Sequence, residues 1–343
     1  MGAEQAKPIA LIAPTGNNAV LDSLIREANG YLMIKDCKHA LPIVNQALLI
    51  QSNAVGEYTA GKCAVQLNLG TEALKHLESA QKLGQNDPDF SNWLQKAQVL
   101  AHEDADMGQL ESAHFHVWVE GNLHTWKASD TLFPELEKIY DGMCLAWDFY
   151  PANKLQAVLY ESKQYQSRPL PDWTGALYDG KVRIPYNVLQ NWPAHRNVLQ
   201  HEVAHAFVHE ITTARVDTWL DEGIAQHMDG TQFNPARLAA IGLAPLDTLA
   251  MDFVSHTDPT DAERLYVSSL GLFELLLQKG AHGNISEIKP LLTSLREGAP
   301  LAEQIKAHYG ISLSELYQTL AEQVAKSKFA AKDSSAQGDG SKP

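Results

Sequence analysis

The spacing of apolar and polar residues changes twice along the chain. From residue 19 to about 105 the apolar residues recur at helical spacing. His114–Val119 then alternates in the manner of a strand, and Leu155–Tyr160 is a second strand candidate. From about 195 to 326 the pattern is again helical almost throughout. This order predicts an α+β fold, in which a strand-rich lobe follows one helical region and precedes another.

Shorter segments complete this prediction. Asp130–Phe149 has helical spacing between the two strand candidates. Tyr178–Gly180 is a turn signal, which predicts a hairpin whose second arm contains Val182. Residues 1–18 predict an irregular lead-in because proline and glycine interrupt them. Residues 329–343 are polar and rich in glycine and serine, and they predict a disordered tail.

The first helical region, residues 19–108, contains a weak internal repeat. Small and apolar residues recur after 33 positions: Ala28, Leu32, Ala40, Leu41 and Ala47 are followed by Gly61, Val65, Ala73, Leu74 and Ala80. Small residues let paired helices approach closely, while the apolar residues fill the space between them. The pattern resembles two tetratricopeptide helical hairpins followed by a capping helix around Trp93–Ala101. An ordinary helical bundle is the alternative interpretation.

Composition restricts the classes of function. The 343 residues include 27 basic and 41 acidic side chains, so the formal charge is 27 − 41 = −14. An acidic surface repels phosphate groups, and we therefore expect neither nucleic acid nor an anionic membrane surface as a partner. The sequence contains no run of about 18 apolar residues, so it predicts no transmembrane helix. The compartment stays open: the chain is cytoplasmic at face value, but periplasmic or secreted if a signal was trimmed from it.

The strongest chemical signal is the HExxH motif that begins at His201 and ends at His205. Residues four apart lie on the same face of a helix, so both imidazoles can bind one metal ion. Glu202 then lies beside the metal without having to bind it. The flanking residues are apolar and predict a mostly buried helix, in which a polar seam is costly unless a ligand satisfies it.

A catalytic zinc ion needs three protein ligands and one open position. Glu222 follows His205 by 17 residues, enough for the helix to end, turn and start an antiparallel partner. The competing third ligand is a histidine six residues after His205, but Ile211 stands there, and Val208 replaces the glycine that this alternative also needs. The sequence therefore predicts His201, His205 and Glu222 as the ligands of one zinc ion per chain.

The two motifs together resemble a known class of protein. HEVAH followed by Trp219–Ala225 (WLDEGIA) is similar to gluzincin zinc metallopeptidases, and most of all to the peptidase MA-like family, over about residues 113–326. Asp172–Pro185 (DWTGALYDGKVRIP) also resembles a segment of that family. Asp221 stands where the clan usually has asparagine, a departure that leaves the ligand itself unchanged. The resemblance implies a thermolysin-like catalytic domain over residues 112–328, with a small mixed β-sheet lobe and a helical lobe.

The chemistry implied is hydrolysis of peptide bonds. A site of two neutral imidazoles and one carboxylate leaves the bound ion net positive, which lowers the pKa of its water to near 7. Glu202 would act as the general base that accepts the proton of the attacking water and passes it to the leaving nitrogen. The resemblance assigns Tyr266 as the donor to the oxyanion, since related enzymes use a tyrosine that opens a helix downstream of the glutamate. The absence of a GxMEN motif favours an endopeptidase.

Two side chains near the motifs are secondary candidates. His209 follows His205 by four residues and is expected to be partly buried and hydrogen bonded. Gln226 follows Glu222 by four residues, from where it could reach a ligand imidazole.

Other functions stay open from the sequence. One is a helical-repeat adaptor with a catalytically silent or structural zinc domain, and another is a zinc hydrolase that acts on something other than peptides. The complete set of two histidines and two glutamates argues against a silent site, because degenerate relatives usually lose the base or a ligand. We expect a peptide or protein substrate, and a protein partner bound by the helical repeats.

Overall fold

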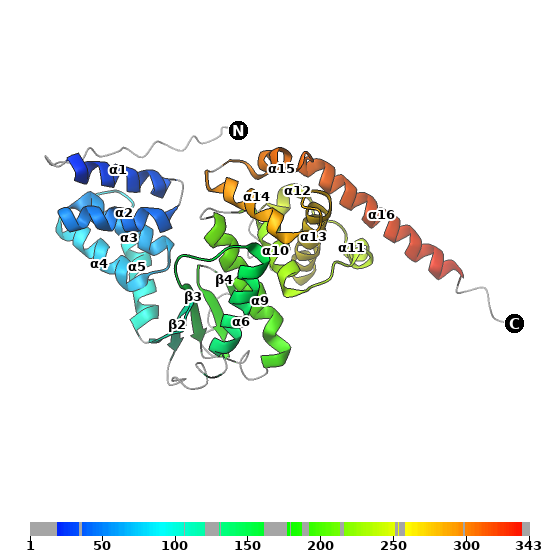
Figure 1. The fold of residues 1–343 in the computed structure, drawn as a ribbon, viewed down its shortest axis with the longest axis horizontal. Helices are drawn as coiled ribbons and strands as arrows, with labels where there is room; N and C mark the ends of the chain where they lie inside the picture. Colours follow the sequence, from blue (N-terminus) through cyan, green and yellow to red (C-terminus); the bar gives the residue numbers. More distant parts are fainter. Residues whose placement is uncertain are drawn as a thin grey trace. The chain divides into compact units, whose positions relative to one another are not determined.

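The structure of the chain is a computed structural model that describes residues 19–33, 36–105, 107–120, 130, 132–160, 177–178, 180–186, 192–212, 216–250, 253, 258–297 and 299–337. It divides into two compact units, Met1–Ala105 and Asp106–Pro343 (Figure 1). The lead-in expected at residues 1–18 lies outside the described residues, as does most of the first half of the segment Asp172–Pro185.

The described part of the first unit is a series of helices, each packed on the next along the chain. They are α1 (Ala19–Met33), α2 (Cys37–Ile50), α3 (Ala54–Gln66), α4 (Gly70–Lys82) and α5 (Phe90–Ala105). Asp36 and Asn53 begin α2 and α3, where their side chains accept hydrogen bonds from backbone N–H groups of the first turn. Helices α2 and α4 start 33 residues apart (70 − 37), the same interval as the repeated small residues.

Small residues bring these helices into close contact. The alanines of the repeat are fully buried, namely Ala28, Ala40, Ala47, Ala73 and Ala80. A Cβ atom at Gly61 of α3 would lie 2.6 Å from Cγ of Leu77 in α4, and one at Gly70 would overlap the backbone of Leu100 in α5. A side chain at either glycine would overlap its neighbour, and the helices would have to move apart.

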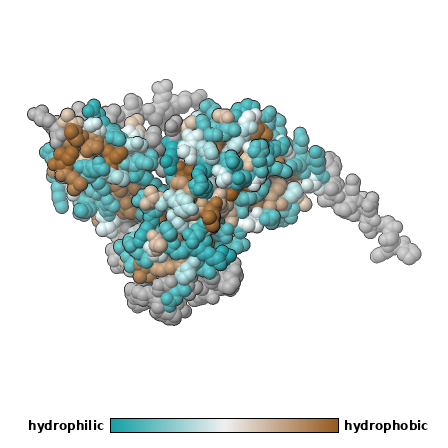
Figure 2. Space-filling model, in the orientation of Figure 1, coloured by the Kyte–Doolittle hydropathy of each residue, from teal (hydrophilic) through white to brown (hydrophobic). Residues whose placement is uncertain are grey.

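The first unit also exposes apolar side chains. Figure 2 shows hydrophobic residues gathered over its first helices. The exposed fractions of Val20, Leu49 and Ile50, at the start of α1 and the end of α2, are 60%, 87% and 45%.

The described strands of the second unit form one small mixed sheet. They are β1 (Met107–Glu111), β2 (Phe115–Glu120), β3 (Leu155–Tyr160), β4 (Leu177–Tyr178) and β5 (Val182–Pro185), in the order β1-β2-β3-β5-β4. The inner strands β2, β3 and β5 are parallel, and the two outer strands are antiparallel to their neighbours. The α+β class is therefore observed, and β4 and β5 form the expected hairpin.

Strand β1 is not predicted by the sequence pattern. Its residues Met107–Glu111 show little alternation of apolar and polar side chains. Pairing with β2 supplies the hydrogen bonds that hold it, with Gly108 opposite Val119 and Leu110 opposite Val117. The second compact unit therefore includes β1, which precedes residue 112, the start that the resemblance implied for the catalytic domain.

Helices form the rest of the second unit. They are α6 (Phe133–Trp147), α9 (Trp192–Thr212), α10 (Thr218–Asp229), α11 (Pro235–Ile241), α12 (Leu246–Leu249), α13 (Pro259–Lys279), α14 (Lys289–Ser294), α15 (Leu301–Tyr309) and α16 (Leu313–Gln337), with short 3₁₀ turns η3 (Ile285–Ile288) and η4 (Leu295–Glu297). Helix α16 continues through residues 329–337, where the sequence predicted a disordered tail. Extending an existing helix adds one hydrogen bond per residue without a new nucleus, so alanine and lysine can carry it on.

One hydrophobic core joins the sheet to these helices. Its largest fully buried side chains include Phe115 of β2, Trp147 of α6, Phe207 of α9, Trp219 of α10 and Phe273 of α13. Helix α6 packs on β2, and α9 packs on β4 and β5. The core thus fixes α9 and α10 against the sheet and α13. None of the described helices is both long enough and apolar enough to cross a membrane.

Candidate metal centre

Helix α9 positions the HExxH motif inside the second unit. Leu199, Val203 and Phe207 are fully buried on it, as the apolar flanks of the motif predicted. Arg296 of η4 fixes the end of the helix, where its guanidinium donates hydrogen bonds to the carbonyl oxygens of Glu210 (3.1 Å) and Ile211 (2.5 Å). These carbonyl groups belong to the last turn, which has no partners within the helix.

Helix α10 presents Glu222 to the motif. Gly223 follows it at the closest approach of α10 to α13: a Cβ atom there would lie 2.5 Å from Cβ of Phe273 and 2.8 Å from the carbonyl oxygen of Ser269. The missing side chain lets the two backbones meet. Trp219 and Ile224 are fully buried on the same helix, so packing fixes the rotation of α10 about its axis.

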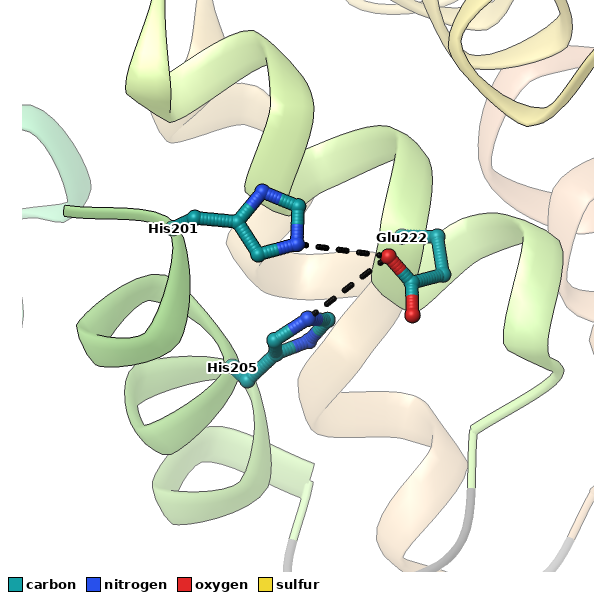
Figure 3. A group of neighbouring side chains, drawn as sticks. All are labelled: His201, His205 and Glu222. Carbon is teal, nitrogen blue, oxygen red and sulfur yellow. Dashed lines mark ion pairs between the residues drawn. The ribbon is translucent and has the colours of Figure 1, made fainter. Parts of the chain in front are cut away.

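The three predicted ligands come together. Nε2 of His201 lies 3.3 Å from Oε2 of Glu222, and Nε2 of His205 lies 3.7 Å from the same oxygen. One ligand atom from each residue lies within 4.8 Å of the other two. Figure 3 shows both imidazoles reaching from one helix toward the carboxylate on the next. The loop between α9 and α10 is therefore long enough for the antiparallel return that the 17-residue spacing predicted.

The donor set fits a metal ion. Oε2 of Glu222 is buried and, among the described residues, has no hydrogen-bond partner. A buried carboxylate oxygen without a hydrogen bond is costly, and a cation placed between it and two ring nitrogens would satisfy it. Two imidazoles and one carboxylate are a ligand set of catalytic zinc. The residues present therefore fit a zinc ion, and zinc stays a prediction.

Negative charge around the ligands favours a cation. Burial acts to lower the pKa of His201, but the hydrogen bond to Asp229 and the nearby carboxylate of Glu222 outweigh it and hold this pKa well above its usual value. Burial also opposes the charge on His205, but the carboxylates of Asp221 and Glu222 raise the pKa of this imidazole to about 9. The carboxylates thus draw positive charge to this point of the molecule.

Both ligand histidines contact a carboxylate through their second ring nitrogen. Nδ1 of His201 lies 2.8 Å from Oδ2 of Asp229, and Nδ1 of His205 lies 2.9 Å from Oδ1 of Asp221. Such contacts orient an imidazole so that Nε2 faces the metal. Sequence reasoning missed Asp229. Its position seven residues after Glu222, two turns along the same face of α10, is the signal that could have found it.

Glu202 lies next to the ligands in the buried part of α9 and is 7% exposed. Burial raises the pKa of its carboxyl group above the usual value, and the positive charge of His201 and His205 only partly opposes this shift. A carboxyl group with a raised pKa is better matched to proton transfer near neutral pH than an ordinary glutamate.

Tyr266 does not open a helix, in contrast to the tyrosine position that the resemblance implied. Helix α13 starts at Pro259, so Tyr266 lies two turns inside it. Its ring packs edge-on against Phe253, with centroids 5.7 Å apart, and its carbonyl oxygen accepts a hydrogen bond from Nε2 of Gln226 at 2.9 Å. The backbone of Tyr266 is thus bonded to Gln226, the residue one helical turn after Glu222 on α10.

Of the two secondary candidates, Gln226 has partners other than those expected, whereas His209 is hydrogen bonded as expected. Nε2 of Gln226 donates to the carbonyl oxygens of Glu222 and Tyr266 rather than to a ligand imidazole. Nε2 of His209 donates to Oδ2 of Asp221 at 3.1 Å, in line with the expected hydrogen-bonded histidine. Tyr178 of β4 stacks on the ring of His205, with centroids 6.4 Å apart, and lies tilted against the ring of His209, with centroids 5.0 Å apart.

Comparison with known proteins gave no match. No protein-family model matches the chain, and no similar protein was found among curated proteins or among solved structures. The function is therefore inferred from the residues and geometry of the site formed by His201, His205 and Glu222.

Proposed function

We propose that the chain is a zinc-dependent peptidase, with one zinc ion held by His201, His205 and Glu222. The observation that carries the proposal is the meeting of these three side chains at one point, with a buried glutamate oxygen that lacks a hydrogen bond. When bound, zinc supplies a Lewis acid that lowers the pKa of water to near 7 and polarises a carbonyl group. The other steps belong to side chains of this chain.

Glu202 is the general base of the proposal. Its carboxylate accepts the proton of the attacking water, and the carboxylic acid formed then donates this proton to the nitrogen of the leaving amine. Burial favours this exchange because the neutral form of Glu202 is stabilised relative to an exposed glutamate. Tyr266 is proposed as the donor to the oxyanion. Tyr266 lies inside α13 rather than at its start, where the resemblance implied this tyrosine. The Tyr266→Phe variant therefore tests the role of oxyanion donor.

The finer features of the fold are part of the same proposal. We assign the second unit to the gluzincin type of metallopeptidase domain, on the two ligand motifs and the mixed sheet that precedes them in the chain. We assign the first unit to tetratricopeptide-like hairpins, on the 33-residue interval and its buried alanines. The substrate is then a peptide or protein, cut internally, and the first unit is proposed to bind a protein partner.

The experiment is a digest of a peptide library by the full chain. The protein loaded with one equivalent of zinc, the Glu202→Gln variant and a chelator-treated sample are compared by mass spectrometry. We expect cleavage by the wild type, loss on chelation, and a rate about 10²–10⁴-fold lower in Glu202→Gln. Zinc content should stay the same in this variant, because Glu202 is not a ligand.

A matched control separates the role of Glu202 from a general loss of acidic charge. Glu303→Gln removes one carboxylate from an exposed position on α15 and should cleave at the wild-type rate. A zinc-loaded Glu202→Gln protein that retains full activity would contradict the mechanism. Zinc binding without cleavage of any peptide would favour the adaptor alternative, or a hydrolase that acts on other substrates.

A further inference from the structure

A carboxylate bridges two histidines beside the proposed metal ligands. Oδ1 of Asp221 lies 2.9 Å from Nδ1 of His205, and Oδ2 of the same carboxylate accepts a hydrogen bond from Nε2 of His209 at 3.1 Å. The three residues thus form a row from the ligand imidazole outward. Asp221 is mostly enclosed, with 17% of its side chain exposed, whereas 34% of the His209 side chain is exposed.

We propose that Asp221 and His209 are positioning residues of the metal site, with Asp221 fixing the ring of His205 and His209 fixing Asp221. The inference concerns the site of the proposed function and rests on that proposal only through the metal. A carboxylate beside Nδ1 favours a hydrogen at this nitrogen and leaves Nε2 for the ion. The ring and carboxylate are at hydrogen-bonding distance but not aligned as a hydrogen bond, and a small rotation of the imidazole would align them.

The carboxylate of Asp221 is suited to a bridge in which both histidines donate. A carboxylate can accept one N–H group on each oxygen, whereas an asparagine side chain has a single acceptor oxygen and two donor hydrogens. An asparagine could accept from His205 through its oxygen, but its amide group could only donate to His209, which would force Nε2 of His209 to act as the acceptor. Aspartate, the residue that departs from the resembling clan, allows the row to extend to His209.

Tyr178 covers the row from the edge of the sheet. Its ring is nearly parallel to that of His205, at 19°, and it lies closer to His209. Because β4 pairs with β5, this contact attaches the outer histidine to the sheet, while Asp221 and His205 belong to α10 and α9. Three elements thereby hold one ligand ring, a rigid support of the kind that a precise metal site needs.

The test is a double-mutant cycle on zinc affinity, measured by competition with a chromophoric chelator. Asp221→Ala should weaken zinc binding by about 10–100-fold, the usual effect of removing the partner of a ligand histidine. His209→Ala should weaken it by a smaller factor. In the Asp221→Ala background, His209→Ala should cause no further loss, because His209 acts only through Asp221.

Asp221→Asn and His227→Ala complete the set. Asp221→Asn keeps the volume of the side chain and should give an intermediate affinity. His227 is a matched control on α10, because its Nδ1 lies 2.6 Å from Oε1 of Glu274 and it does not contact the ligands in any described interaction. His227→Ala should leave zinc affinity unchanged. Independent losses from Asp221→Ala and His209→Ala that multiply in the double variant would overturn the proposal.

A second measurement does not depend on activity or on zinc. The Nδ1–H proton of His205 should give a slowly exchanging downfield resonance in ¹⁵N-labelled protein, with or without zinc, and Asp221→Ala should abolish it. If the wild type binds no zinc but shows this Asp221-dependent signal, the proposed function fails and the positioning of His205 stands. If the signal is the same in Asp221→Ala, the positioning inference fails even when the wild type binds zinc.

Discussion

At the scale of single residues, Gly223 sets the position of Glu222, a proposed metal ligand. We predict that Gly223→Ala destabilises the second unit by about 1–3 kcal/mol, because the new methyl group would lie 2.5 Å from Cβ of Phe273. The same change at Gly142, exposed in α6 with nothing within 4 Å of an added Cβ, should stabilise the protein by about 0.5–1 kcal/mol. Denaturant unfolding of the two variants measures both effects. Equal effects of the two substitutions would contradict this explanation.

A histidine of the first unit gives a prediction for pH. Nδ1 of His76 lies 2.7 Å from Oε2 of Glu57, and Glu72 is also within ion-pair distance. Burial acts to lower the pKa of His76, but hydrogen bonds to Glu72 and Glu57 outweigh it and raise this pKa. A raised pKa means that the stabilisation is fully present below the unfolded-state pKa of about 6.5 and is lost as pH rises through the folded-state value.

His76→Gln should therefore destabilise α3 and α4 more at pH 6 than at pH 9. Hydrogen exchange of peptides from these helices measures the difference. His102→Gln changes an exposed histidine of α5 and should show no such dependence. A cost of His76→Gln that grows toward high pH would reverse the sign and contradict the assignment.

The ligands could be predicted from the sequence because helical spacing is a local property. His201 and His205 lie on the same face of any α-helix that contains them. To place Glu222 beside them, only one turn between two helices had to be assumed. Asp229 could not be predicted with the same certainty, because its contact with His201 depends on how far α10 slides along α9. The bridge from Asp221 to His209 depends on the same register. Contacts between elements are set by packing, which the spacing of one helix does not contain.

At the scale of elements, the end of α9 depends on a side chain from a distant segment. We predict that Arg296→Ala destabilises the second unit by about 1–3 kcal/mol, because the carbonyl groups of Glu210 and Ile211 lose a charged donor. Lys306→Ala is the matched control: its ammonium donates to the carbonyl oxygen of Gly310 at an exposed helix end and should matter by less than about 0.5 kcal/mol. Thermal unfolding of both variants tests the difference.

Element boundaries were predictable where the pattern was strong. Leu155–Tyr160 matches β3 residue by residue, and Asp130–Phe149 encloses α6. Strand β1 escaped prediction since an edge strand of five partly exposed residues has no buried face to impose alternation. Helix α16 continues to Gln337, past residue 329 where the disordered tail was predicted to begin. The glycine- and serine-rich composition predicted disorder, but alanine and lysine in this stretch have high helix propensity.

At the scale of the whole molecule, zinc should act as a stabilising ligand. Binding to the native state alone adds about 2.7 kcal/mol to the free energy of unfolding when free zinc is 100 times its Kd. We predict slower hydrogen exchange in α9 and α10 on addition of zinc, and reversal by a chelator. His205→Ala should abolish the effect, because it removes one of three ligands. Equal protection in that variant would show that zinc binds elsewhere.

The division at residue 105 could be approached from the sequence, since the change from helical spacing to alternation falls near it. The core that unites the sheet with the second helical region could not. Phe273 belongs to the same core as Phe115 and Trp147 although it lies more than a hundred residues after both, and only the fold brings them together. Long-range packing of this kind is decided by tertiary contacts rather than by local propensity.

The side chains of the proposed metal centre all fall between His201 and Asp229, on the two consecutive helices α9 and α10. The proposed ligands, the proposed base and the carboxylates that orient the ligands therefore lie on one helical hairpin. This set of side chains could be transferred to another pair of antiparallel helices. A graft would need a glycine in the place of Gly223 and a flat partner surface like that of Phe273 and Ser269. It would also lack the aromatic cover of Tyr178, so a transplanted hairpin should hold its ion less rigidly than the parent.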